Sequence, residues 1–188
     1  MTVTALDPKT ALIVIDLQKG LVSLPTVHPI EGVVTHVSTM AAAFREQGLP
    51  VVLVNVAGAP AVRTEQRRRT HAFPEGWIDL VPGLNQQAQD HVVTKYTPGA
   101  FTRTDLKAHL QALGVTQIVM SGIATSNGVE VTARQAYELG FNVSFAIDAM
   151  TDLDADAHSY SVTRVFPRIG ETGTTGEIIA LLRRGDPS

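Results

Sequence analysis

The feature that most limits the fold of this chain is a continuous apolar run over residues 11–15 that ends in an acid, Asp16. A strand that is apolar on both faces is typical of the middle of a parallel sheet covered by helices. A second run of this kind spans residues 51–56. Between the two, residues 32–47 carry apolar side chains three and four positions apart and stop at Gly48. These segments predict a strand, a helix and a second, parallel strand.

The same alternation continues to the end of the chain. Asp148 is expected to end one of the later strands as Asp16 ends the first, and the Thr104 hydroxyl is expected to cap a helix. Alternating strands and helices predict an α/β fold: a three-layer, doubly wound, Rossmann-like, mostly parallel sheet with helices on both faces. The 188 residues are expected to form a single domain, 1–188. The later strands are expected at 91–94, 117–122, 142–147 and 168–169, and the later helices at 104–113, 127–139, 154–165 and 175–183.

The chain contains no cysteine. This excludes disulfides, thiolate metal sites, iron–sulfur clusters and every mechanism that uses a cysteine nucleophile. The net charge of −3 gives no electrostatic attraction to nucleic acid or to anionic membranes. No apolar run approaches the roughly 18 residues that span a bilayer, and the N-terminus lacks the pattern of a signal peptide. We therefore expect a cytoplasmic protein that binds neither nucleic acid nor membrane.

Three segments that directly follow predicted strands are the candidates for a functional site. In open α/β sheets, ligands bind beyond the carboxyl ends of the strands, near the point where the strand order reverses. Asp16 follows the first strand, Lys95 follows the strand at 91–94, and residues 122–128 connect another strand to its helix. Each signal alone is weak, because an acid can cap a helix and a lysine often lies on the surface. Together they predict one crevice.

Four motifs in this order closely resemble the isochorismatase-like hydrolases, a superfamily that also contains nicotinamidases, carbamoylsarcosine hydrolases and related cysteine amidohydrolases. The resemblance covers almost the whole chain and implies hydrolysis of a small-molecule substrate, homo-oligomerisation and the Rossmann-like fold. The motifs are ALIVIDLQKG at 11–20, KYTPGAFTRTDL at 95–106, SGIATSNGVEVTARQA at 121–136, and GFNV at 140–143 followed by Asp148 and Ala149.

The resemblance implies a catalytic aspartate at Asp16 and a catalytic lysine at Lys95. In the amidohydrolase branches it also implies a cysteine nucleophile at the position that Gly128 occupies here. Without a thiolate, the acyl-enzyme route to amide hydrolysis is closed. Metal-dependent nicotinamidases carry an Asp-x-His pair after the second strand, where this chain has NVAGAP at 55–60. We therefore expect no metal and no cofactor.

True isochorismatases also carry glycine at the position of Gly128. They cleave a vinyl ether, a reaction that needs a general acid and no covalent nucleophile. The resemblance makes Asp16 that acid, with Lys95 orienting the anionic substrate and stabilising charge, and Gly128 leaving room for substrate and water. Isochorismate is the best-motivated substrate, with dihydroxy-dihydrobenzoate and pyruvate as the products.

The resemblance also indicates how the pocket is lined. Ala124 replaces an aromatic residue of isochorismatases, and their glutamine is absent at 57–58, so the substrate pocket is expected to differ. A non-proline cis peptide of the family would fall between Ile123 and Ala124, directing backbone N–H groups of 124–128 into the crevice. Arg67 matches a substrate-binding arginine, although its cluster at 67–69 also suits a solvated helical face. Thr125, Phe101 and Trp77 are the further lining candidates, whereas Tyr96 and His158 are interpreted as structural.

Two other functions stay open from the sequence. The absent nucleophile and the altered pocket wall fit a family member that has lost catalysis and serves as a small-molecule-binding or assembly protein. Amide hydrolysis by water activated without a thiol is a third interpretation. Turnover of an enol ether, binding without turnover, and ammonia release from small amides would separate the three.

Overall fold

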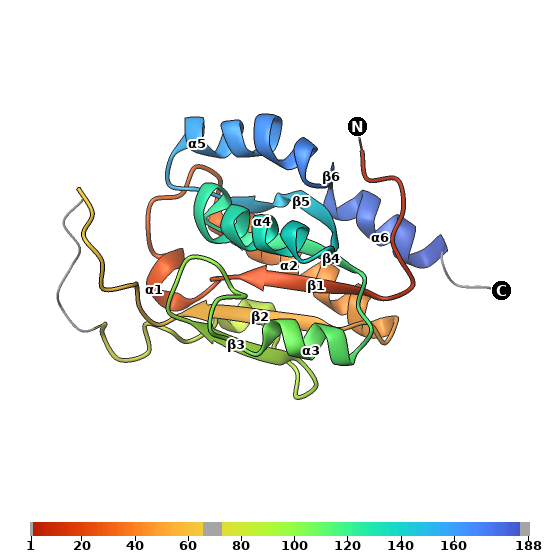
Figure 1. Cartoon of the computed structure of the whole chain (residues 1–188), viewed down its shortest axis with the longest axis horizontal. Helices are drawn as coiled ribbons and strands as arrows, with labels where there is room; N and C mark the ends of the chain where they lie inside the picture. Colours follow the sequence, from red (N-terminus) through yellow and green to blue (C-terminus); the bar gives the residue numbers. More distant parts are fainter. Residues whose placement is uncertain (1, 66–72, 185–188) are drawn as a thin grey trace.

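The fold is a single sheet of six parallel strands, in a computed structural model that describes residues 2–65 and 73–184. The strand order is β3-β2-β1-β4-β5-β6 (Figure 1). β1 therefore lies at the centre, and the order reverses between β1 and β4. This confirms the doubly wound α/β prediction. The strands are β1 Thr10–Ile15, β2 Val51–Val56, β3 His91–Lys95, β4 Gln117–Ile123, β5 Asn142–Thr151 and β6 Glu171–Gly173.

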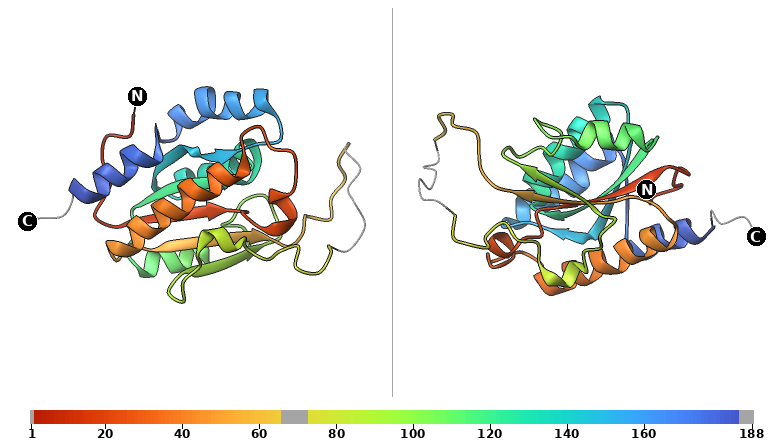
Figure 2. Two further views of the ribbon diagram at one scale, coloured as in Figure 1. Left: turned by 180° about the vertical axis from the view of Figure 1, so that it is seen from behind. Right: turned by 90° about the horizontal axis from the view of Figure 1, so that it is seen from below.

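Helices cover both faces of the sheet. Figure 2 shows α2 and α6 together on one face, and Figure 1 shows α3 and α4 on the other. Short helices, α1 and α5, and several single turns complete the connections. The helices are α1 Lys19–Val22, α2 Ile30–Glu46, α3 Leu106–Ala112, α4 Glu130–Glu138, α5 Ala155–Tyr160 and α6 Thr175–Arg184.

β1 is buried on both of its faces, as its apolar run predicts. Leu12 and Val14 pack into the core under α2 and α6, whereas Ile13 and Ile15 pack into the core under α3 and α4. All four side chains are fully buried. Alternating strand residues point to opposite faces, so one strand joins the two cores. This fixes the carboxyl end of β1 between both helical layers.

β5 is longer than the pattern predicts. It runs through Asp148 to Thr151, with a register shift against β4 between Met120 and Gly122. Asp148 does not end the strand as expected. Its Oδ1 accepts hydrogen bonds from Thr175 N at 2.7 Å and Thr175 Oγ1 at 2.9 Å at the start of α6. The Asp148 carboxylate therefore binds the N-terminus of the neighbouring helix α6.

The last strand, β6, lies a few residues later than predicted. Phe166–Arg168 form a 3-10 turn, which displaces the strand from 168–169 to Glu171–Gly173. At the start of α3, the Thr104 hydroxyl donates to Ala100 O at 2.5 Å and accepts from Leu106 N at 3.4 Å, so it contacts the first helical N–H as predicted, although Asp105 is the N-cap residue.

The predicted helix at 127–139 has a different first turn. Thr125–Val129 form a π-helical turn, and regular α-helix begins only at Glu130. Turns of this type often occur at functional sites. In the ranges 2–65 and 73–184, no helix combines the length and apolar character needed to cross a membrane.

Candidate active site

Asp16 stands at the carboxyl end of the central strand. Its backbone is in the left-handed region, with a φ of 54°, so the chain turns away from the strand direction there. Its N–H still donates to Val54 O on β2 at 2.9 Å, and the residue is only 4% exposed. Such a conformation is uncommon for a residue other than glycine and persists where the surroundings determine it. The sheet thus fixes the Asp16 side chain at the edge where the parallel strands end.

Lys95 brings a buried ammonium to this carboxyl. It is the last residue of β3, which lies two strands from β1, a separation of roughly 10 Å at the usual strand spacing. The long side chain crosses this gap: Nζ donates to Asp16 Oδ2 at 2.7 Å and to Pro98 O at 2.9 Å. Lys95 is 1% exposed. The two residues form an ion pair that is almost fully removed from water.

The environment of Asp16 favours its protonated form. Burial raises the pKa of the Asp16 carboxyl to about 6, even though the Lys95 ammonium and its hydrogen bond act in the opposite direction. Asp16 Oδ1 is buried and has no hydrogen-bond partner among the described residues. A buried acceptor without a partner is costly. This oxygen is therefore free to carry a proton.

The connection after β4 closes over Asp16. Gly122, with a φ of 111°, lies so close to β1 that any Cβ would overlap the Ile15 carbonyl. The Ile123–Ala124 peptide bond is cis, which confirms the prediction for this loop. At Gly128, a Cβ would lie 3.1 Å from Asp16 Oδ2 and 2.9 Å from Ile15 Cγ2. The structure thus brings Gly128, Asp16 and Lys95 together.

Side chains from β5 and α5 hold this loop in place. Ser126 N donates to Asp152 Oδ2 at 2.7 Å, and Thr125 Oγ1 donates to Thr151 O at 3.0 Å and also contacts His158 Nδ1 at 2.9 Å. Burial, followed by the neighbouring His28, lowers the pKa of His158, whereas Asp152 raises it. The Thr125 side chain, predicted to line the pocket, is fully buried and serves to anchor the loop.

Asp152 was not among the residues that the sequence singled out. Its carboxylate is 4% exposed and also accepts from Leu153 N at 2.7 Å and Asp154 N at 3.4 Å. The signal that points to it is an acid directly after a long apolar strand, the same signal that marks Asp16. From the sequence, the acid after this strand is Asp148, because the strand was expected to end at residue 147.

Trp77 lies beside the β1–α1 connection, at the same edge of the sheet as Asp16. Its indole stacks on Phe73 with ring centroids 3.9 Å apart, and a Cβ at Gly20 would overlap that indole. Gln18, also missed by the sequence analysis, is fully buried; its amide donates to Trp77 O at 3.3 Å and accepts from Val56 N at 2.7 Å. The segment around Trp77 is thus attached to β1 and β2.

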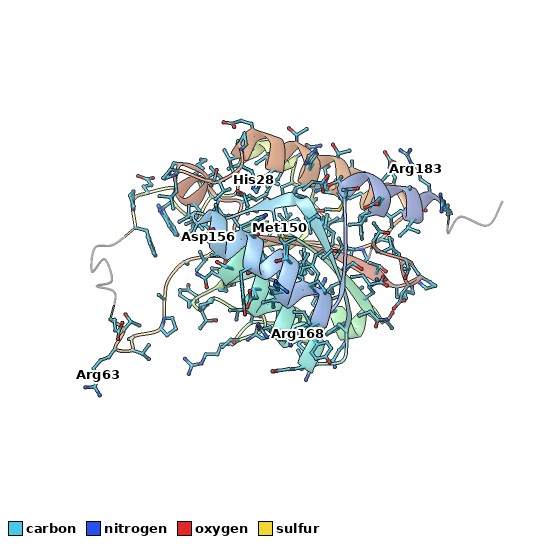
Figure 3. The ribbon with its side chains drawn as sticks, turned by 90° about the horizontal axis from the view of Figure 1, so that it is seen from above. His28, Arg63, Met150, Asp156, Arg168 and Arg183 are labelled. Atoms are coloured by element: carbon cyan, nitrogen blue, oxygen red, sulfur yellow. The ribbon has the colours of Figure 1, made fainter. Side chains whose placement is uncertain are left out.

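The other residues that the sequence singled out near the crevice lie in different surroundings. Phe101 packs under α4, with its ring centroid 6.0 Å from that of Phe141. Ala124 is half-buried against the core under α2, and Tyr96 is 62% exposed. Arg67 and its cluster lie outside the described residues. Nearby Arg63 is on a segment that projects away from the sheet (Figure 3).

A groove of about 610 Å³ lies at the opposite edge of the sheet, between the amino ends of β4 and β5 and the turn before β6. The residues lining it include no buried polar atom without a partner, whereas Asp16 has one. Within the described ranges, no three His, Cys, Asp or Glu side chains gather closely enough to hold a metal ion. The centre around Asp16 is therefore the candidate active site.

Comparisons with known proteins agree with this geometry. The isochorismatase domain matches residues 10–177. The chain is 38% identical to the isochorismatase family protein YwoC of Bacillus subtilis, over 91% of this chain and 93% of YwoC. It is 37% identical to the family protein YecD of Escherichia coli O157:H7, over 92% of this chain and 96% of YecD.

A solved structure and a more distant relative extend the comparison. An isochorismatase family protein from Burkholderia thailandensis superimposes with a TM-score of 0.92, at 40% identity, covering 95% of this chain and 98% of that one. The chain is also 24% identical to the maleamate amidohydrolase of Pseudomonas putida, over 93% of this chain and 87% of the relative. The domain match and the relatives that align over nearly their full length show that this chain belongs to the isochorismatase family of hydrolases.

Proposed function

We propose that the protein hydrolyses a vinyl ether of a small anionic substrate without a metal ion, and that isochorismate is the substrate to test first. The observation that carries the proposal is the Asp16 carboxyl: its buried Oδ1 has no hydrogen-bond partner among the described residues, while its Oδ2 accepts from the buried Lys95 ammonium and faces Gly128. A nucleophile is absent from position 128, but an acid is in place. Vinyl-ether cleavage is the hydrolysis that needs only the acid.

Asp16 supplies the proton in this reaction. The protonated carboxyl transfers its proton to the terminal methylene of the enol ether, which becomes a methyl group and leaves an oxocarbenium ion. A pKa of about 6 suits a general acid that works near neutral pH. Water adds to the cationic carbon and releases a proton to Asp16. In the resulting hemiketal, the bond between this carbon and the ether oxygen then breaks, and the hydroxyl proton passes to that oxygen. The products are pyruvate and an alcohol.

Lys95 stabilises Asp16 after the proton has left. The carboxylate that forms is 2.7 Å from the ammonium, and this ion pair is strong because water is excluded. Two of the three Lys95 N–H groups have protein partners, so a third is available to an anionic substrate. Glycine at 128 avoids a side chain that would crowd Asp16 Oδ2.

The test is pyruvate release from isochorismate by the wild type, Asp16→Asn and Lys95→Met. Asp156→Asn and Lys107→Ala, both at exposed positions, are controls of matched charge change. We expect turnover in the wild type and in both controls, and a loss of about a hundredfold or more in Asp16→Asn, the scale of a general acid. Full activity of Asp16→Asn would refute the acid role. Binding of isochorismate without turnover would favour the interpretation as a binding protein.

A further inference from the structure

The Lys95 ammonium has a second contact that sets its position. Besides Asp16, it donates to the carbonyl of Pro98 at 2.9 Å. A buried ammonium needs several acceptors to offset its lost hydration. The Pro98 carbonyl therefore decides, together with the carboxyl, where the ammonium lies. Any change in the loop that carries Pro98 would move the charge beside Asp16.

The loop after β3 is attached to helix α4 rather than to the sheet. Ala100 N donates to Thr132 Oγ1 at 3.1 Å. One helical turn later, Gln135 Oε1 accepts from Phe101 N at 3.2 Å, and Gln135 Nε2 donates to Thr102 Oγ1 at 2.7 Å. Residues three apart lie on one face of a helix. One face of α4 thus holds the loop that presents the Pro98 carbonyl.

The Thr132 hydroxyl also holds the loop on the other side of the pair. It donates to Gly128 O at 2.7 Å while it accepts from Ala100 N, and Thr132 is fully buried. A threonine that bonds to the carbonyl four residues earlier is common in helices. The second bond is the unusual one, because it joins the loop above Asp16 to the loop that holds Lys95.

We propose that Thr132, supported by Gln135, is a positioning residue that fixes the Lys95 ammonium relative to the Asp16 carboxyl through the Pro98 carbonyl. Its hydrogen bonds go to the two loops and not to the ion pair itself. Its effect on turnover rests on the proposed function, whereas its effect on the titration of Asp16 does not. A purely structural role would lower stability and leave that titration unchanged.

The variant that tests this is Thr132→Val, which keeps the shape and removes the hydroxyl. Thr132→Ser restores the hydroxyl, and Thr39→Val removes a threonine bond to the carbonyl four residues earlier in α2, far in sequence from the site. The Asp16 carboxyl is titrated by NMR in each full-length protein without substrate, with its signal assigned by Asp16→Asn. Pyruvate release from isochorismate gives kcat and KM for the same proteins.

In Thr132→Val we expect the Asp16 midpoint to rise, because a displaced ammonium lowers the carboxyl pKa less. We expect kcat to fall about tenfold with KM within about twofold, since small displacements of catalytic groups cost this much or more. Thr132→Ser and Thr39→Val should keep the wild-type midpoint. Gln135→Met, at a half-buried position, should shift the Asp16 midpoint in the same direction. This variant replaces Thr132→Val in the test if Thr132→Val does not fold.

The outcomes separate the two proposals. A shifted Asp16 midpoint in a protein without any pyruvate release supports the positioning role and overturns the proposed function. A lowered kcat with an unshifted midpoint in both Thr132→Val and Gln135→Met overturns the positioning role. So does a Thr132→Val protein that matches the wild type in both measurements.

Discussion

A Cβ added at Gly128 would come within 3.1 Å of Asp16 Oδ2. Two segments separated by more than a hundred residues thus approach so closely that a side chain at 128 does not fit between them. The absence of cysteine from the chain coincides with this spacing, since a residue with a Cβ at 128 would have to displace either Asp16 or Ile15.

Gly128→Ala tests this spacing directly. The methyl group would lie 2.9 Å from Ile15 Cγ2 as well as close to Asp16, so we expect kcat/KM for isochorismate to fall at least about tenfold through misplacement of the carboxyl. Gly32→Ala is the matched control, because nothing lies within 4 Å of its Cβ. It sits inside α2 and should stabilise the protein by about 0.5–1 kcal/mol. Unchanged kinetics in Gly128→Ala would contradict the crowding.

The buried ion pair makes a prediction about stability. Lys95→Met leaves the Asp16 carboxyl without its partner, and Asp16→Asn leaves an unpaired ammonium; each should lower the free energy of unfolding by about 3–5 kcal/mol. The double variant removes both charges and should be more stable than either single variant. Urea denaturation followed by circular dichroism measures all three.

The exposed pair of Lys19 and Asp79, 2.9 Å apart, provides the comparison for this cycle. Lys19→Met should cost less than about 1 kcal/mol, because exposed pairs are screened by water. Equal losses in Lys19→Met and Lys95→Met would show that burial of the second pair does not govern its energy.

The raised pKa of Asp16, about 6, predicts how activity depends on pH. A general acid acts only while protonated, so kcat/KM should decline about tenfold per pH unit above that value. In Lys95→Met the decline should begin at higher pH, because the ammonium that lowers the carboxyl pKa is gone. A profile that stays flat from pH 5 to 8 would exclude Asp16 as the acid.

The same carboxyl affects stability in the direction opposite to most acids. Its pKa in the folded protein, about 6, exceeds the value of about 4 in unfolded chains, so the folded state binds the extra proton. Its contribution is complete below about pH 4 and is lost as the pH rises through 6. The difference in unfolding free energy between wild type and Asp16→Asn, measured from pH 4 to 7, isolates this contribution. A difference that grows with pH would contradict it.

Asp152 is expected to matter for both stability and activity. Asp152→Ala removes the acceptor for three backbone N–H groups, including that of Ser126, and should cost about 1–3 kcal/mol and loosen the loop above Asp16. Asp154→Ala is the control, because it removes a helix cap from exposed α5 and should cost about 0.5–2 kcal/mol with full activity. Thermal unfolding and pyruvate release distinguish them, and an active Asp152→Ala enzyme would contradict the role of the loop.

Much of the fold follows from periodicity along the chain. The buried run at 11–15 predicts a central strand, and the positions of Asp16 and Lys95 after strands predict that they meet, because parallel strands end at one edge. The ladder of β5 could not be predicted past Asp148, since a register shift against β4 allows a polar residue to stay in the strand. Its continuation to Thr151 depends on partners that only the sheet provides.

The anchoring residues were harder to foresee. Gln18, Asp152 and Thr132 act by accepting from or donating to backbone groups that are distant in sequence. No local pattern marks Gln18 or Thr132, because each is polar in a segment where polar residues are common. Asp152 does carry the signal of an acid after a strand, but that strand was expected to end earlier. Phe101, whose aromatic side chain suggests a pocket wall, lies on a loop whose backbone is held by Gln135 of α4, and this contact too joins segments distant in sequence.

Lys95 belongs to β3, the outermost strand of its half of the sheet, which pairs with β2 alone. Edge strands open more readily than central ones. The Lys95 ammonium is therefore held by an edge strand, whereas the Asp16 carboxyl is held by the central strand. Local opening of β3 would separate the Lys95 ammonium from the Asp16 carboxyl while the other strands stay paired. We therefore expect activity to be lost before the protein unfolds as a whole.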